Sequence, residues 1–78
     1  MKSNVRKYSN RLKDLRQDRD MSQREIAKLF YLQPTQYQRY ENGYTDLPLE
    51  WAKKFARYYN VSIDYIAGII DSPEKLQR

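Results

Sequence analysis

The most distinctive chemistry in this chain lies between Gln33 and Gly43, where hydroxyl, amide and guanidinium side chains crowd together. This segment predicts a helix, because Pro34 suits a first helical position and Gly43 suits a helix end. At about 100° per residue, Tyr37 and Tyr40 share the inward side of that helix. The opposite side, here called the outer face, carries Thr35, Gln38, Arg39 and Asn42. Groups of these types on a short helix can read base edges in a DNA major groove.

A plain solvated surface or a protein contact would also place polar residues on an outer face. The kind of polarity favours DNA over these alternatives. Solvated helix faces are usually rich in Glu and Lys, which favour helix, and the four outward positions hold neither.

Composition excludes several kinds of chemistry. The 78 residues contain no cysteine and no histidine, so disulfides, the usual zinc ligands and Ser-His or Cys-His catalysis are absent. A chain of this length forms one domain with a small core. We therefore expect a non-enzymatic protein with no metal and no cofactor. The eight tyrosines fit a core better than a nucleophile, with Tyr8, Tyr37, Tyr40 and Tyr59 as the expected core members.

The net charge of +5 is concentrated near the N-terminus, because residues 1–24 hold eight basic and three acidic residues. The basic residues are Lys2, Arg6, Lys7, Arg11, Lys13, Arg16, Arg19 and Arg24. Such a field favours a polyanion such as nucleic acid, although a solvated basic face is nearly as common. No apolar run approaches the roughly 18 residues of a membrane span, and no signal-peptide core is present, so we expect a cytoplasmic protein.

The spacing of apolar residues is helical throughout and predicts an all-α fold. The first helix is expected over about residues 4–18, on a stripe of Val5, Tyr8, Leu12 and Leu15. The second begins at a capping box formed by Ser22 and Glu25 and ends near Tyr31.

The remaining boundaries follow from similar signals. The third helix is the segment with the outer face, and the fourth runs from near Pro48 to Asn60, which tolerates a left-handed stop. The fifth spans about residues 62–67 and is closed by Gly68. We expect a domain over residues 1–70 and a polar tail over residues 71–78.

The segments "MSQREIAKLFYLQPTQYQRYENG" and "LPLEWAKKFARYYNVSIDYIAG" together resemble the Xre-like family of helix-turn-helix regulators, the group of the phage Cro and lambda-type repressors. The resemblance covers about residues 5 to 68. It implies a compact five-helix bundle in which the second and third helices form the helix-turn-helix and the third enters the major groove.

The resemblance also implies roles for individual residues. Gln23 would contact a phosphate, while Gln33, Thr35 and Arg39 would touch bases. Asn42 and the backbone around Gly43 and Tyr44 would hold the DNA backbone. Arg16 and Glu41 would form a structural ion pair.

Three residues depart from the family pattern. Tyr31 replaces the usual turn glycine and must adopt a left-handed conformation or bend the turn differently. Gln33 is a poor helix cap, and Pro34 has no donor to offer a base. Recognition should therefore rest more on Thr35, Gln38 and Arg39.

The expected function is that of a sequence-specific transcriptional regulator, most simply a repressor from a phage or mobile element that occupies a double-stranded DNA operator. A dimer is expected, since one such domain reads few base pairs. Its candidate contacts are the apolar residues left over from the core, namely Ile69, Ile70, Tyr58, Tyr65 and Trp51. The alternatives are a protein-interaction module or antitoxin on the same fold and, more remotely, a small enzyme.

Overall fold

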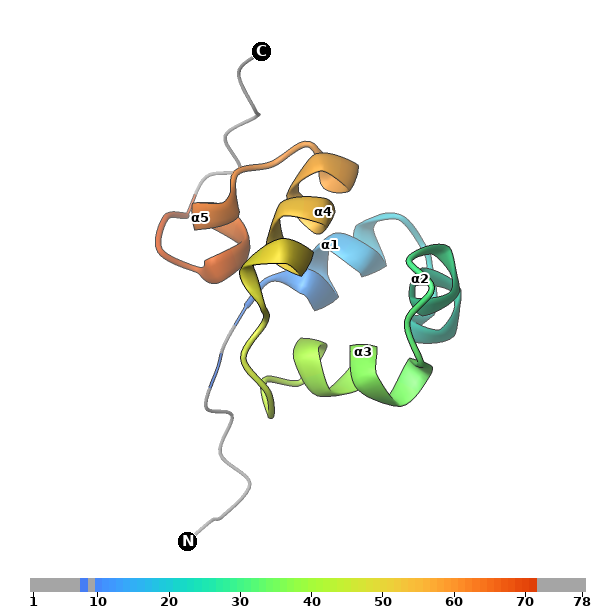
Figure 1. The fold of residues 1–78 in the computed structure, drawn as a ribbon. Coiled ribbons are helices and arrows are strands. Elements are labelled where there is room, and N and C mark those ends of the chain that lie inside the picture. Colours follow the sequence, from blue (N-terminus) through green and yellow to red (C-terminus); the bar gives the residue numbers. More distant parts are fainter. Residues whose placement is uncertain (1–7, 9, 72–78) are drawn as a thin grey trace, which may run out of the picture.

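The computed structural model describes Tyr8 and residues 10–71, and this part of the chain contains five helices and no strand. Figure 1 shows the helices folded around one centre. The all-helical prediction is confirmed. In chain order the helices are α1 (Leu12–Asp18), α2 (Gln23–Leu29), α3 (Pro34–Glu41), α4 (Leu49–Tyr59) and α5 (Ile63–Ala67).

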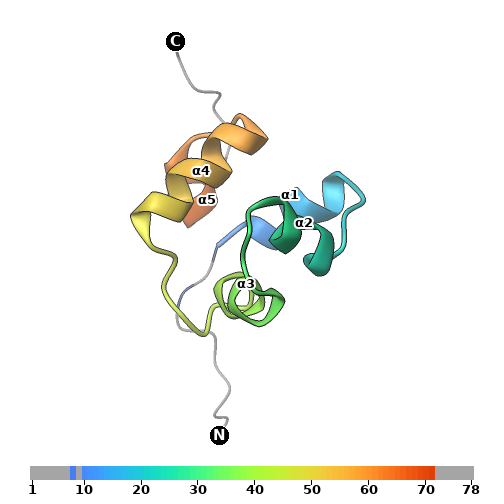
Figure 2. The same ribbon diagram turned by 45° about the vertical axis from the view of Figure 1, so that its right-hand side comes forward.

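Each helix contributes a large apolar side chain that is fully buried in the core. These residues are Leu12, Ile26, Tyr37, Phe55 and Ile66. Helix α2 packs against α3, and α4 packs against α5. Turning the molecule in Figure 2 shows α3 at the edge away from α4 and α5. Thr35, Gln38 and Arg39 are exposed, so one long side of α3 faces solvent.

An aromatic cluster joins the turn after α2 to α4. The ring of Phe30 lies edge-on to Phe55, with 4.6 Å between centroids, and also contacts Trp51 and Tyr58. Edge-to-face aromatic pairs of this kind add stability beyond the area that they bury. They fix the position of the turn from which α3 starts.

Serine caps start two of the helices. Ser22 Oγ accepts the N–H of Glu25 at 3.0 Å, and Glu25 Oε1 accepts the N–H of Ser22 at 2.8 Å, which confirms the capping box. Ser62 caps α5 by accepting the N–H of Tyr65. Gln33 makes no side-chain cap bond at the start of α3, as expected for a poor cap.

Residues in the left-handed conformation end α4 and α5 at the positions that the sequence predicts. Asn60 closes α4 with φ 57° and Gly68 closes α5 with φ 85°. Tyr31 has φ 58° and is 96% exposed, so it takes the left-handed form at the turn without burying its ring. An L-residue pays about 1–2 kcal/mol for this conformation.

The first helix starts later than predicted. Tyr8 and Asn10 are not helical, and α1 begins at Leu12 rather than near residue 4. Asn10 Oδ1 accepts the N–H of Leu12, while the N–H of Tyr8 donates to the carbonyl of Gly43. The first bond is to a side chain and the second is to a distant carbonyl, and both take the place of the backbone hydrogen bonds that a helix would form here. Tyr8 is 36% exposed and does not belong to the core, contrary to expectation.

Some predictions fall outside the described residues. Val5 and most of the predicted tail lie in residues 1–7, 9 and 72–78. Within the described chain, no helix is both long enough and apolar enough to cross a bilayer.

Candidate nucleic-acid interface

The two sides of α3 differ as the helical spacing predicts. Tyr37 and Tyr40 are buried, whereas three members of the outer face are exposed and the fourth, Asn42, is half-buried. The exposed members are Thr35, Gln38 and Arg39. Gln33, immediately before the helix, is exposed as well. The structure thus gathers five of the predicted contact residues along one helix.

The segment after α3 differs in part from expectation. The N–H of Gly43 donates to the carbonyl of Tyr40, and the N–H of Tyr44 donates to that of Arg39. These two backbone donors, placed against the DNA backbone by the resemblance, are therefore already occupied. Tyr44 keeps an exposed side chain, whereas Gly43 is buried. Of the two side chains expected to hold the DNA backbone in this segment, that of Tyr44 is exposed and that of Asn42 is half-buried.

Arg39 is held toward the same segment, because its Nε donates to Thr45 Oγ1 at 3.3 Å. The guanidinium retains its other donors. A fork-shaped cation on the outer face can donate two parallel hydrogen bonds to guanine.

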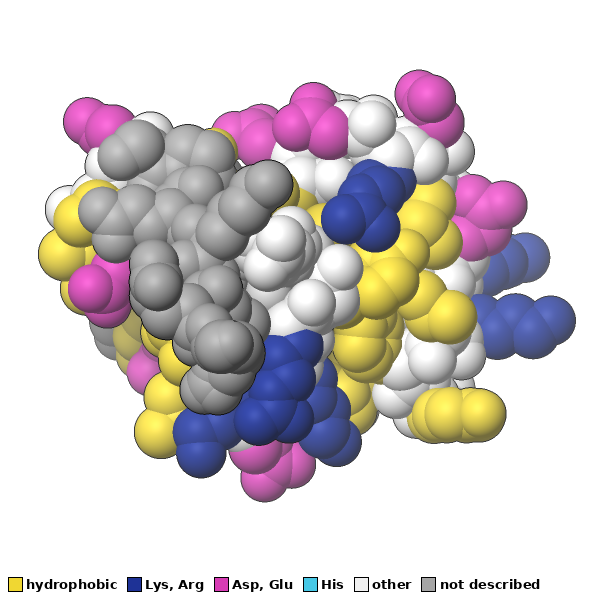
Figure 3. Space-filling view, turned by 90° about the horizontal axis from the view of Figure 1, so that it is seen from above, with side chains coloured by type: hydrophobic (Ala, Val, Ile, Leu, Met, Phe, Trp, Pro, Cys, Tyr) yellow, Lys and Arg dark blue, Asp and Glu magenta, His cyan; other side chains and the backbone are white. Residues whose placement is uncertain are grey.

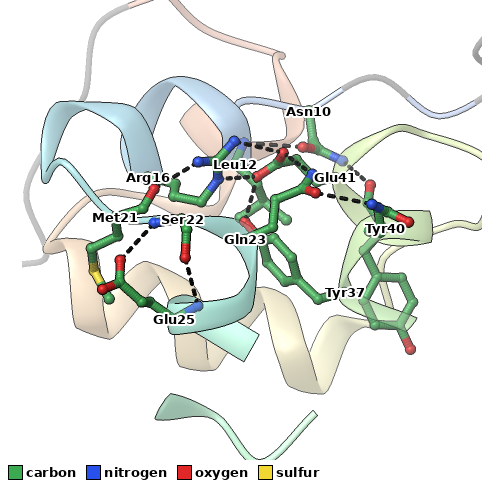
Figure 4. Close-up of polar contacts among 11 residues, drawn as sticks. Asn10, Leu12, Arg16, Met21, Ser22, Gln23, Glu25, Tyr37, Tyr40 and Glu41 are labelled. Atoms are coloured by element: carbon green, nitrogen blue, oxygen red, sulfur yellow. Dashed lines mark hydrogen bonds and ion pairs between the residues drawn. The ribbon is translucent and has the colours of Figure 1, made fainter. Parts of the chain in front are cut away.

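An ion pair fastens α3 from behind. Arg16 Nε lies 2.8 Å from Glu41 Oε2, and Arg16 Nη2 lies 3.1 Å from Glu41 Oε1. Arg16 also donates to the carbonyl of Met21 at 2.7 Å. Figure 4 shows these contacts joining α1, the following loop and α3. Glu41 is only 2% exposed, so the pair is buried.

Two further donors reach the Glu41 carboxylate. The hydroxyl of Tyr37 donates to Oε2 at 2.7 Å, and Gln23 Nε2 donates to Oε1 at 2.7 Å. Burial by itself would raise the pKa of Glu41, but the bonds from Arg16, Tyr37 and Gln23 outweigh it and lower that pKa. The hydrogen bond to Glu41 also raises the pKa of Arg16. Both groups are therefore charged near neutral pH.

Gln23 is placed differently from a simple phosphate ligand. Its Nε2 faces Glu41, and its Oε1 accepts a hydrogen bond from Gln38 Nε2 at 3.1 Å. The buried carboxylate thus connects through Gln23 to the outer face of α3. Helical periodicity within α2 or α3 gives no signal for a contact between those helices, and the sequence prediction missed this one.

Asn10 is a second residue that the sequence prediction missed. Its Nδ2 donates to the carbonyl of Tyr40 at 2.8 Å, while its Oδ1 accepts the N–H of Leu12. It therefore links the start of α1 to the last turn of α3 (Figure 4). Asparagine before a helix is a familiar local signal, but its partner 30 residues away is not.

A shallow groove of about 470 Å³ lies beside the start of α3. Its lining combines two cations of α2 with the turn and is formed by Arg24, Lys28, Tyr31, Leu32, Gln33 and Pro34. Pro34 lines this groove with an apolar surface, in keeping with its lack of a donor. The described residues hold no cluster of three or more acidic, histidine or cysteine residues able to bind a metal.

Much of the basic charge near the N-terminus serves the fold. Besides Arg16, Arg11 donates to the carbonyls of Tyr65 and Ile70 and stacks on the Tyr65 ring at 4.5 Å. Arg19 stacks over Tyr58 and Tyr59. Lys2, Arg6 and Lys7 lie outside the described residues. The described residues therefore contribute less basic surface than the net charge of the whole sequence indicates.

The face opposite α3 does not present one basic field. In Figure 3, on the part drawn in colour, Lys and Arg side chains stand in separate groups with acidic and hydrophobic side chains among them.

These features define a class: an all-helical domain in which α2 and α3 form a helix-turn-helix and α3 presents a polar face. The helix-turn-helix family model matches residues 12–66, and the chain belongs to this family. The resemblance to Xre-like regulators is confirmed.

Two relatives have informative names. The uncharacterized HTH-type transcriptional regulator YobD of Bacillus subtilis (strain 168) is 33% identical over 72 residues, which are 91% of this chain and 64% of that protein. The cryptic phage CTXphi transcriptional repressor RstR of Vibrio cholerae is 36% identical over 56 residues, 72% of this chain and 50% of that protein. The chain thus spans between half and two thirds of these relatives. No solved structure matches it.

Proposed function

We propose that this protein binds duplex DNA at a specific sequence and regulates transcription by occupying an operator, most simply as a repressor. The observation that carries the proposal is the way in which α3 is anchored to the rest of the domain. Its inner side is buried and tied to α1 and α2 through Glu41, while its outer face stays exposed. The names of the two relatives, a regulator and a repressor, support the same reading.

In this proposal the outer face enters the major groove. Thr35, Gln38 and Arg39 contact base edges, and Gln33 reaches a base from just before the helix. Phosphates are held by Asn42, by Tyr44 and by Gln23 at the start of α2, where the helix dipole favours an anion. Such backbone contacts fix register, while the base contacts carry sequence information.

The proposal includes a homodimer, because helix-turn-helix proteins bind half-sites one DNA turn apart. Ile69, at 72% exposure, is the best-supported dimer contact, with Ile70 and Tyr65 half-buried beside it. Tyr58 and Trp51 are less available than expected because both pack against Phe30.

The dimer contact is tested by an Ile69→Lys variant, which should shift sedimentation equilibrium toward monomer. An unchanged dimer would remove Ile69 from the interface.

DNA binding is tested by titrating the protein with a duplex from upstream of its own coding sequence at several salt concentrations. We expect affinity to fall with salt as phosphate-bound counterions are released, and a scrambled duplex to bind much more weakly. Absence of binding at low salt, or binding indifferent to both salt and sequence, would contradict the proposal.

The role of Arg39 is tested by Arg39→Ala, which should weaken the specific site by about 1–3 kcal/mol and change non-specific binding less. The matched control is Arg57→Ala, which removes the same charge from an exposed position on α4. Equal losses in both variants would mean that Arg39 acts only through net charge.

A protein-interaction module is the second candidate. It is favoured by a groove of about 420 Å³ that is formed by α5, the start of α4, the loop before α4 and the segment before α1, and that Leu47, Leu49 and Ile63 help to line. Purification of a stable complex with another protein, by a chain that ignores duplex DNA, would favour this function over the first.

A further inference from the structure

The buried carboxylate of Glu41 connects to the outer face of α3 through two glutamine amides in series. Gln23 Nε2 donates to Glu41 Oε1 at 2.7 Å, and Gln38 Nε2 donates to Gln23 Oε1 at 3.1 Å. We call Glu41, Gln23 and Gln38 the amide relay. It starts at a residue that is 2% exposed and ends at an exposed one.

The chemistry of the groups dictates the direction of every bond in the relay. An ionised carboxylate only accepts hydrogen bonds, so Gln23 must turn its NH₂ group toward Glu41. The carbonyl oxygen of Gln23 then faces Gln38 and cannot donate. Gln38 must therefore donate from its own NH₂ group. Reversing either amide would place two acceptors or two donors next to each other.

Glu41 is held firmly enough to impose this order. Its two oxygens also accept from Arg16 and from the Tyr37 hydroxyl, at distances of 2.7 to 3.1 Å. These charge-assisted bonds are stronger than those between neutral groups. Rotation of the carboxylate or its protonation would break several of them at once.

The relay leaves Gln38 with a defined outward pattern. One Nε2 hydrogen serves Gln23, while the second Nε2 hydrogen and Oε1 have no partner among the described residues. One donor beside one acceptor matches the N7 acceptor and the N6 amino group of adenine in the major groove. Guanine offers two acceptors there and would leave Oε1 of Gln38 without a donor.

We infer that Glu41 and Gln23 are positioning residues that orient the Gln38 amide, so that Gln38 selects an A·T base pair. The inference rests on the proposed function and deepens it by assigning a base preference. It also gives the ion pair of Arg16 and Glu41 a part in sequence selection in addition to its part in the fold.

The test is selection of bound fragments from a randomised duplex library by the full chain and its variants, followed by sequencing. The wild-type chain should select adenine at one position of each half-site, and Gln38→Ala should lose that preference. Gln23→Met removes both relay bonds and should reduce the preference at that position by about 5- to 150-fold, the worth of one bidentate base contact. Preferences at other positions should hold.

A Gln23→Lys variant gives a sharper result, because its ammonium donates to Glu41 and also to Oε1 of Gln38. The Gln38 amide should then turn its two donors outward, and selection should shift from adenine to guanine at the same position. The matched control is Gln36→Met on the same helix, since Gln36 donates to the Tyr40 hydroxyl and lies outside the relay. It should leave the adenine preference intact.

The outcomes separate the two levels of the account. If Gln23→Met weakens all sequences equally and keeps the adenine preference, Gln23 is a phosphate contact only and the relay is overturned. An unshifted preference in Gln23→Lys would overturn it too. If the wild-type chain selects no sequence at all, the proposed function itself fails.

Discussion

Glu41 is the residue on which the site most depends. Its carboxylate accepts hydrogen bonds from Arg16 on α1, Gln23 on α2 and Tyr37 on α3. A buried charge without such partners would cost several kcal/mol, so removing one partner of a buried pair is commonly worth about 3–5 kcal/mol. Stability and the orientation of α3 therefore depend on the same group.

The pH dependence of folding follows from the lowered pKa of Glu41. The carboxylate's contribution is fully present above its ordinary pKa of 4.5 and is lost as pH falls through the lower pKa of the folded state. Urea unfolding at pH values from 7 down to 2 should show a falling free energy of unfolding below pH 4.5. The double variant Arg16→Met with Glu41→Leu, measured in parallel, should show a shallower fall; an equal slope would exclude Glu41 as a source.

The hydroxyl of Tyr37 provides a more local test. Tyr37→Phe removes one donor to a buried carboxylate and should lower the free energy of unfolding by about 1.5–3 kcal/mol. Tyr40→Phe is the matched control, because the Tyr40 hydroxyl accepts a hydrogen bond from the neutral Gln36 amide. Its loss should cost about 0.5–1.5 kcal/mol. Equal costs in urea titrations would mean that the charge on Glu41 adds nothing to the Tyr37 bond.

At the scale of elements, the turn between α2 and α3 sets the angle of α3. Tyr31 holds this turn in a left-handed conformation, and Phe30 anchors it to α4 through ring contacts. The left-handed backbone at Tyr31 is strained. Its side chain is exposed and packs against almost nothing. The anchoring and the strain are therefore separable by mutation.

Tyr31→Gly should raise the free energy of unfolding by about 1 kcal/mol, since glycine accepts a positive φ without the steric cost of a Cβ. Tyr31→Ala keeps the Cβ and should leave stability nearly unchanged. Thermal unfolding monitored by circular dichroism measures both. A destabilised glycine variant would show that the exposed ring, rather than the backbone, matters at this turn.

Local signals explain which elements could be predicted from sequence. The capping box at Ser22, the left-handed stop at Asn60 and the buried stripe of α4 depend on neighbours within a turn or two. The start of α1 could not be found this way, because Asn10 and Tyr8 are held by Tyr40 and Gly43. The apolar stripe continues through Tyr8 toward the N-terminus, but these distant partners hold Tyr8 and Asn10 outside the helix.

The same distinction holds for the site. Helical spacing sufficed to separate Tyr37 and Tyr40 from the outer face, and the family resemblance supplied the pair of Arg16 and Glu41. The contact between Gln23 and Gln38 joins two helices and depends on their packing, which spacing along one helix does not encode. Sequence therefore indicated the residues but not the bonds that orient them.

At the scale of the whole molecule, charge and shape have different roles. Several arginines that make the first third basic are engaged by Tyr65, Tyr58 and Glu41 within the fold. Arg16 pairs with Glu41 and Arg11 pairs with Asp71, so these two cations add little to a long-range field. Under the proposed function, specificity comes from the outer face of α3. A homodimer would double that face and set the spacing of two half-sites.

The most direct measurement of the central claim is protection of a DNA fragment from upstream of the coding sequence against nuclease cleavage. The account predicts a discrete protected segment with two related half-sites about 10 base pairs apart, centre to centre. Arg39→Ala should need about 5- to 150-fold more protein for the same protection, whereas Arg57→Ala should protect nearly as well as the wild-type chain. Uniform cleavage at saturating protein, or protection that spreads over any fragment without a boundary, would contradict it.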